Sequence, residues 1–312
     1  MGDPLPLTPA QSRTPNADAT PLIRTVDGTT IRVRPLTSVA DGHACVELQR
    51  LVWGFDQGDI VPATLLHIVE YVGGLAAGAF DQNGTLLGFV FGISGVRDGR
   101  LAHWSHMLGV REPARNMGVG RMLKEYQRSV LASLGVTRIY WSFDPLMAKN
   151  AYFNVNRLGA KVVDYVPDMY GTTDSPLHYR LPTDRLVVCL ETTGPAAAPL
   201  NLPVHDRAPI LTAFPRLSDA TMSNGDLPPD AVLIEIPGDI LEIMSRSPAA
   251  ARAWRLAVRE HFLWAFSHGY AISGVQVDAD AARYFFLLTL QPAGATDVPT
   301  TSPIRAIHAS PA

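Results

Sequence analysis

The stretch "RNMGVG", residues 115–120, carries two glycines between an apolar run and a helix-like pattern. From Val119 onward, apolar residues recur with the i, i+3, i+4, i+7 spacing of an amphipathic helix. The first N–H groups of a helix have no internal acceptor, and the helix dipole attracts negative charge to them. Glycines at 118 and 120 let the backbone approach a ligand closely. The stretch therefore predicts an anion site, with a phosphate as the expected ligand.

Two common phosphate loops do not fit this stretch. The dinucleotide fingerprint needs three glycines in a parallel βαβ unit, and the P-loop needs Lys and then Ser or Thr after its last glycine. Met117 and Arg121 stand where those motifs need other residues. A nucleotide-binding kinase is accordingly the least favoured function.

The elements that must position the loop are mostly strands joined by short turns. Alternating or apolar runs predict strands at 29–36, 74–81, 85–96, 99–110, 137–145, 160–167 and 185–191. Helical spacing is seen at 38–54, 62–74 and 146–159, each ending at a glycine. The turns "QNG" and "RDG" favour hairpins, so the three strands before the loop form an antiparallel meander. The helix after the loop is expected to expose Arg121, Lys124 and Arg128 opposite its apolar stripe.

The segment "LGVREPARNMGVGRML" resembles the motif of the GNAT superfamily of acyl-CoA-dependent N-acyltransferases. Arg115, Gly118 and Gly120 fall on its defining positions, and the order of elements from about 30 to 190 also fits. The resemblance implies an α+β fold with a mostly antiparallel central sheet flanked by helices. It also implies that the anion is the pyrophosphate of coenzyme A, bound by Arg115 and the backbone of residues 116–120 (Asn116, Met117, Gly118, Val119 and Gly120).

Further site residues follow from the same resemblance. Leu108 and Val110 would lend backbone groups to the thioester oxygen and the pantetheine amides. Asn150 would bond the pantetheine arm, although Asn150 and Asn154 could equally form a solvated helix face. The chain departs from the family at Val155, where many members carry the tyrosine that protonates the leaving sulfur. It departs again at Asn116, where glycine is usual.

Acylation of an amine needs a group that removes the amine's proton. His106 is the leading candidate, since it lies on the strand just before the loop. His103 lies an odd number of residues away, so the two imidazoles are expected on opposite faces of the strand. Either histidine could instead be structural. Neither Cys45 nor Cys189 lies in a context that favours a covalent acyl-enzyme.

Several other residues have ordinary structural explanations. Asp144 precedes a proline and is expected to cap the following helix. Trp53 could shape an acceptor pocket or be buried in the core. Arg252, Arg255 and Arg259 form a helical stripe that is typical of a solvated face, although such a stripe could also bind a carboxylate.

The chain of 312 residues is expected to hold two units. We expect a tail at 1–22, a GNAT acyltransferase domain at 30–190 and a Pro/Ala linker at 191–205. A smaller C-terminal α+β unit follows at 206–291, in which a degenerate duplication is one interpretation, and a tail follows at 292–312. The whole chain looks like a poorly characterised subgroup with a C-terminal extension, whose relatives are thought to acylate amino acids.

The composition of the chain limits the binding partners that we expect. A net charge of −3 argues against nucleic acid, and the absence of a long apolar run argues against a membrane. Two cysteines and no leader pattern favour the cytoplasm. The sequence thus predicts transfer of an acetyl or succinyl group from acyl-CoA to a small primary amine, with no metal, and leaves a homodimer open. The alternatives are an acyl-CoA-binding module without turnover and a protein or peptide N-acetyltransferase.

Overall fold

The computed structural model describes residues 19–54, 60–171, 181–194, 211, 213–217, 229–278 and 282–292. By their contacts, the residues form two compact units, Met1–Ile139 and Tyr140–Ala312. No helix among the described residues is long and apolar enough to cross a membrane.

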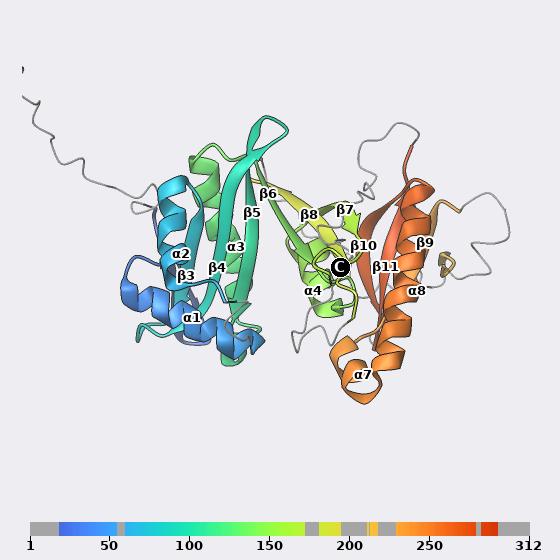
Figure 1. Ribbon diagram of the computed structural model, residues 1–312, viewed down its shortest axis with the longest axis horizontal. Coiled ribbons are helices and arrows are strands. Elements are labelled where there is room, and N and C mark those ends of the chain that lie inside the picture. The colour runs from blue at the N-terminus through green and yellow to red at the C-terminus, as the bar shows by residue number, and fades with distance from the viewer. Residues whose placement is uncertain are drawn as a thin grey trace, which may run out of the picture. The chain divides into compact units, whose positions relative to one another are not determined.

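The first unit is an antiparallel sheet with the strand order β1-β2-β3-β4-β5 (Figure 1). Its strands are β1 (Leu22–Val26), β2 (Thr29–Pro35), β3 (Leu75–Phe80), β4 (Leu86–Arg97) and β5 (Arg100–Val110). Its helices are α1 (Val39–Trp53), α2 (Ala63–Ile68), η1 (Val69–Val72), η2 (Glu112–Ala114) and α3 (Val119–Ser133).

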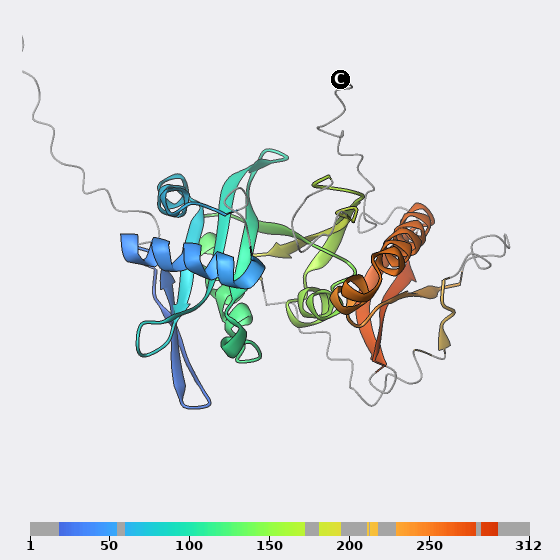
Figure 2. The ribbon, with the colours of Figure 1, turned by 60° about the horizontal axis from the view of Figure 1, so that its bottom comes forward.

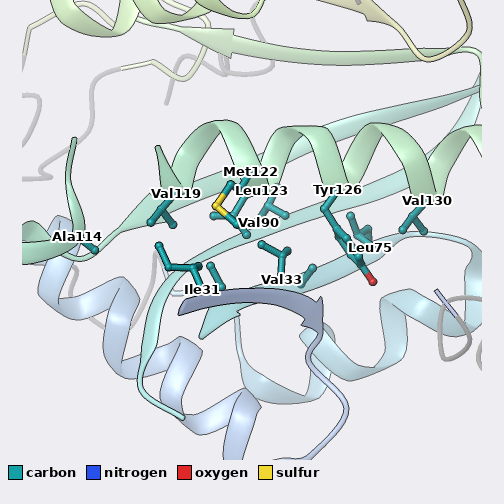
Figure 3. Packing of buried hydrophobic residues seen from close by; sticks show 12 residues of the cluster. Ile31, Val33, Leu75, Val90, Ala114, Val119, Met122, Leu123, Tyr126 and Val130 are labelled. Carbon is teal, nitrogen blue, oxygen red and sulfur yellow. The ribbon is translucent and has the colours of Figure 1, made fainter. Parts of the chain in front are cut away.

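Two apolar clusters, one on each face of this sheet, hold the helices in place. On one face, Leu48 of α1 and Leu66 of α2 pack with Phe89 and Phe91 of β4. On the other, α3 covers Val90 and the neighbouring strands (Figure 3). Figure 2 shows α1 and α3 on opposite sides of the strands. The sheet is thus covered on both faces, and the loop from β5 to α3 crosses from the sheet to one of these layers.

Strand β1 was not expected from the sequence. It pairs with β2 through a tight turn in which Asp27 and Gly28 have φ of 47° and 78°. Positive φ at both central residues is the geometry of a hairpin turn of type I′. The "VDGT" turn was thus a usable signal, hidden because the strand directly follows the Pro- and Thr-rich tail. Residues 1–18 of that tail lie outside the described residues.

The second unit contains two groups of strands. β6 (Arg138–Phe143), β8 (Arg185–Glu191) and β7 (Lys161–Val166) lie in that order, and β7 and β8 are antiparallel. β10 (Tyr270–Asp278), β11 (Arg283–Leu290) and β9 (Ala231–Ile236) form a separate antiparallel sheet. Its helices are α4 (Ala148–Tyr152), η3 (Phe153–Arg157), α7 (Ile240–Arg246) and α8 (Pro248–Ser267).

The predicted fold class is confirmed: the protein is α+β, with a mostly antiparallel sheet flanked by helices and a smaller sheet in its C-terminal part. Two details differ. The helix expected at 146–159 is a short α-helix followed by one π-helical turn, in which Leu158 N bonds Phe153 O at 2.9 Å. Helix α7 was not predicted; Asp239 caps it through the Glu242 N–H.

Elements on either side of the predicted linker share one core. Tyr165 of β7 packs against Phe262 and Phe266 of α8, with ring centroids 5.4 and 6.1 Å apart. Compact units need not coincide with functional domains, so the limits 30–190 and 206–291 stay a prediction. Most of the linker 191–205 lies outside the described residues.

Gly88 of β4 tests how closely α3 is pressed onto the sheet. A Cβ atom at Gly88 would lie 2.9 Å from Gly109 O and 3.0 Å from Val119 Cγ1, whereas one at Gly95 of the same strand would meet nothing within 4 Å. We expect Gly88→Ala to lower the free energy of unfolding by about 1 to 3 kcal/mol through overpacking. Gly95→Ala, the matched control, should leave it unchanged or raise it slightly. Urea unfolding of both variants measures this, and equal stabilities would contradict the close packing.

Candidate functional site

The loop before α3 is anchored in the core by two apolar side chains. Ala114 is 2% exposed and Val119 is 1% exposed, and both belong to the cluster between α3 and the sheet. Figure 3 shows Val119 at the start of α3 and Ala114 on the segment before the helix. The loop is also held where it leaves β5, because Arg111 N bonds Leu87 O at 2.8 Å. Packing and this hydrogen bond therefore hold the loop against the core of the first unit.

Two residues of the loop adopt a left-handed backbone conformation. Asn116 has φ of 70° and Gly118 has φ of 76°. Asparagine tolerates this conformation better than most residues with a side chain. Asn116 can therefore adopt this conformation at a position where the motif that this loop resembles usually has glycine. A Cβ atom at Gly118 would meet nothing within 4 Å, so the backbone conformation, and not crowding, favours glycine there.

The loop leaves a group of main-chain amides open. Arg115 N bonds Glu112 O at 3.1 Å, and Met117 N makes a long bond of 3.4 Å to Ala114 O. The first bond of α3 itself is from Met122 N to Gly118 O, at 3.0 Å. Within the described part of the chain, no acceptor is found for the N–H groups of Asn116, Gly118, Val119 and Gly120.

The charges around these amides favour an anion. The first turn of α3 contains no acidic residue that would neutralise the positive end of the helix dipole. Arg115 is exposed, and no described residue forms an ion pair with it. Arg121, one turn further on, already pairs with Glu125 at 2.9 Å. The loop thus offers several amide donors and one unpaired guanidinium, a combination that suits phosphate oxygens.

His106 occupies a β-bulge of β5. Met107 pairs with Phe91 and Ser105 pairs with Gly92, so His106 is the extra residue between them. Its imidazole is exposed and meets the Phe91 ring edge-on, with centroids 6.1 Å apart, on the face that carries α1 and α2. Desolvation by these neighbours lowers the pKa of His106 from its ordinary value. Its imidazole is therefore neutral at pH 7.

His103 is on the opposite face of β5, as its spacing from His106 predicts, and it is 1% exposed. The ammonium of Lys124 can only donate, so Gln127 accepts on Oε1 (3.1 Å) and turns its Nε2 toward His103 Nε2 (3.1 Å). His103 Nε2 is then the acceptor, and Nδ1–H donates to Ser94 Oγ at 3.0 Å. Burial and the charge of Lys124 lower the pKa of His103 to about 3. With its lone pair engaged, His103 is a structural residue and not a base.

Lys124 corrects the expectation that it lies on a solvated face. It is 4% exposed, and its Nζ donates to Ser105 Oγ at 2.8 Å. Burial lowers its pKa to about 7. The physical reason is a second buried stripe on α3, formed by Lys124, Gln127 and Leu131 at i, i+3 and i+7. This stripe lies beside the apolar one, and the spacing of Gln127 and Leu131 was the signal that could have revealed it.

The end of β5 carries Leu108 and Val110, and Trp53 of α1 packs against it. Leu108 is opposite Val90 and Val110 is opposite Gly88 in the β4–β5 ladder, and both side chains pack on the α3 side. Trp53 lies on the other face, edge-on to Phe89 with centroids 5.8 Å apart. A Cβ atom at Gly109 would come within 2.8 Å of the Trp53 ring. Trp53 therefore covers β5 as a packing residue.

Asn150 lies on α4 in the second unit, exposed, with an orientation set by its neighbours. The indole of Trp141 is a donor only, and its Nε1–H bonds Asn154 Oδ1 at 2.9 Å. Asn154 must then donate through Nδ2, which bonds Asn150 O at 2.9 Å and Asn150 Oδ1 at 3.0 Å. The amide nitrogen of Asn150 remains as the outward group, so this side chain presents hydrogen-bond donors.

The other predicted residues of the second unit serve its structure. Asp144 accepts the Leu146 N–H at 2.8 Å and so caps a turn, whereas the N-cap of α4 is Met147, without a side-chain bond. The solvated stripe expected on α8 is wrong for Arg255, which is 4% exposed and bonds both oxygens of Asp144. Arg252 alone of the three arginines is exposed.

Cys45 is buried, which raises the pKa of its thiol to about 12 and makes it a poor nucleophile. No cluster of three or more His, Cys, Asp or Glu side chains that could hold a metal ion occurs among the described residues.

One buried carboxyl in the first unit was missed by the sequence analysis. Glu70 of η1 is 3% exposed, and its Oε1 has no hydrogen-bond partner in the described structure. Tyr126 of α3 is equally buried, and its hydroxyl bonds no residue that the structure describes. Burial raises the pKa of Glu70 to about 7, against the opposing effect of a hydrogen bond from the Ala76 backbone. A lone glutamate in a short apolar helix gave no signal of burial.

Comparison with known proteins gives similarity in structure only. No protein-family model matches the sequence, and no curated protein is significantly similar to it. The ribosomal-protein-S18-alanine N-acetyltransferase of Escherichia coli is 17% identical over 54% of this chain and 98% of its own, with a TM-score of 0.41. Aminoglycoside 6'-acetyltransferase type Ii is 22% identical over 53% and 97%, with a TM-score of 0.42.

A third solved structure, an acetyltransferase of the GNAT family from Streptococcus pneumoniae, is 15% identical over 52% of this chain and 99% of its own, with a TM-score of 0.41. Its family is the one that the motif at residues 115–120 resembles. At this level of similarity, the substrates of these proteins do not indicate the substrate of this chain.

Glu70 yields a prediction about stability and pH. Its folded pKa of about 7 exceeds the ordinary 4.5, so the native state binds more protons between these values and loses stability as pH rises through them. Glu70→Gln cannot ionise, so its free energy of unfolding relative to wild type should rise by roughly 3 kcal/mol from acid to neutral pH. Chemical unfolding across this range measures the difference. The exposed control Glu260→Gln should show no such trend, and a flat difference for Glu70→Gln would contradict its burial as an acid.

Proposed function

We propose that this protein is an acyl-CoA-dependent N-acyltransferase that binds the pyrophosphate of its donor at the start of α3. The observation that carries the proposal is the group of N–H donors at Asn116, Gly118, Val119 and Gly120, for which no described residue is an acceptor, beside Arg115, which forms no ion pair with a described residue. Two linked phosphates need several donors held at fixed positions, and preorganised backbone amides supply them with little loss of entropy. The resemblance of this motif to the GNAT superfamily supports the same donor.

The proposed reaction is a direct attack of an amine on the thioester. His106 removes the amine's proton, directly or through a water molecule, and the amine nitrogen bonds to the carbonyl carbon. The exposure of His106 and its lowered pKa support this role, because a neutral, accessible imidazole can accept a proton at pH 7. The C–S bond then breaks, and coenzyme A leaves as a thiolate.

The remaining site residues are assigned from the resemblance to the GNAT superfamily. Backbone groups of Leu108 and Val110 would bond the thioester oxygen and the pantetheine arm, and the outward donors of Asn150 would bond a pantetheine carbonyl. Val155 is 4% exposed and offers no proton to the leaving sulfur. A thiol ionises near pH 8.5, so the thiolate can leave and take its proton from solvent.

For the acceptor, we propose a small primary amine such as an amino acid, with acetyl-CoA or succinyl-CoA as donor. Release of free thiol from each donor with a panel of amino acids, polyamines and short peptides decides between acceptors. Preference for peptides would make the protein a peptide N-acetyltransferase. Tight donor binding without thiol release from any mixture would make it a binding module.

Arg115 tests the phosphate contact. Arg115→Ala should raise the Kd for coenzyme A by about 10- to 100-fold, the effect of losing one charge-assisted phosphate contact. Affinity for pantetheine, which lacks the phosphates, should not change. Arg100→Ala, an exposed arginine at the far end of β5, is the matched control. Isothermal titration calorimetry gives each Kd. Equal weakening toward both ligands, or no weakening, would remove Arg115 from the phosphate site.

His106 tests the chemistry. His106→Gln should lower kcat by about 10²- to 10⁴-fold, because a positioned base is lost. The wild-type rate should rise with pH and level off below pH 6.5, since desolvation lowers the pKa of His106 from that value. Thiol release followed across this pH range measures both effects, with the exposed His43→Gln as control. An unchanged rate and pH profile in His106→Gln would exclude it as the base.

A further inference from the structure

Helix α4 and the π-helical turn η3 are tied at both ends to the C-terminal elements. Before α4, Asp144 accepts two bonds from Arg255 of α8, at 2.8 and 2.5 Å. At the end of η3, Asn156 donates to Val275 O at 3.0 Å and accepts from Val275 N at 2.9 Å. The side chains that make these bonds are largely buried: they belong to Asp144, Arg255 and Asn156, and Asn156 is 3% exposed.

The first tether is a strong one. Arg255 is 4% exposed, and its bidentate geometry with Asp144 is the form in which a guanidinium holds a carboxylate most firmly. Burial alone would raise the pKa of Asp144, but the charge and hydrogen bonds of Arg255 lower it below its usual value. The carboxylate therefore stays ionised, and it holds the turn before α4 through the Leu146 N–H.

The second tether, from Asn156 to Val275, bonds the edge of β10 in the way that a neighbouring strand would. β10 is an edge strand of the C-terminal sheet, and the side-chain amide of Asn156 satisfies both main-chain groups of Val275 as a neighbouring strand would. Asn156 is the fourth residue of the π-helical turn itself, Phe153–Arg157. The widened turn brings Asn156 onto β10 while Asn154, two residues earlier, keeps its bonds to Trp141 and Asn150.

We infer that Arg255 and Asn156 are positioning residues for α4, so that α8 and β10 set the orientation of Asn150 for the acyl donor. This inference rests on the proposed function only for the role of Asn150. It assigns to the C-terminal extension a part in donor binding, although none of its residues needs to touch the donor. An α-helix of five residues has little stability of its own, so its orientation depends on such contacts.

The first measurement is hydrogen exchange of the backbone amides of residues 148–157 in the full-length protein. Arg255→Met should speed this exchange by about tenfold or more, because the turn before α4 is released. Arg252→Met, an exposed arginine one turn away on the same helix, is the matched control and should not change it. Asn156→Ala, which removes the second tether, serves if Arg255→Met does not fold. Unchanged exchange in both variants would overturn the inference.

The second measurement is the Kd and KM for acetyl-CoA of the same folded variants. We expect both the Kd and the KM for acetyl-CoA to rise about tenfold, and kcat for the amine to change less. The double variant Asp144→Asn, Arg255→Met should raise the Kd no more than either single substitution does. Faster exchange with an unchanged Kd would make the tethers purely structural and overturn the inference. A wild-type protein that binds no acetyl-CoA would instead refute the proposed function, and the exchange data would still decide whether the C-terminal elements hold α4.

Discussion

The structure of the candidate site depends on one constraint: α3 packs tightly against the sheet while its first amides have no acceptor among the described residues. Val119 meets both demands, since its side chain is buried and its N–H is at the open end of the helix. Ala114 anchors the other side of the loop in the same cluster. The loop between them therefore cannot relax inward to pair its own amides. The position of these amides is thus set by hydrophobic packing on the opposite side of the backbone.

The same helix separates the roles of the two histidines. The buried stripe of Lys124 and Gln127 engages His103 and keeps it neutral. Ser105, next along β5, is held by Lys124 as well. His106, the extra residue of the bulge, directly follows Ser105 and lies on the other face of β5, as alternation along a strand predicts. A polar network inside the core thus engages His103 of β5, whereas His106 of the same strand is exposed.

The order of strands and helices could be predicted because periodicity reports which face of each element is buried. Finer features could not. The bulge at His106 depends on the register between β4 and β5, which no single strand contains. Burial of Lys124 depends on what covers a second face of α3, and an ionisable residue is normally taken as exposed. Conversely, the loop at 115–120 was predictable, since the two glycines and the helical pattern are local signals.

In the second unit, the short helix α4 is held by residues distant in the sequence and not by local signals. Asn150 owes its orientation to a chain of one-way hydrogen bonds that begins at the donor-only indole of Trp141 and passes through Asn154. That chain is useful only if α4 keeps its place, and Asp144 and Asn156 hold it through residues more than a hundred positions further along the sequence. Local propensity contributes little to such a segment. The C-terminal elements are therefore part of the same folding unit as α4, and a chain cut at the predicted linker would lose both tethers at once.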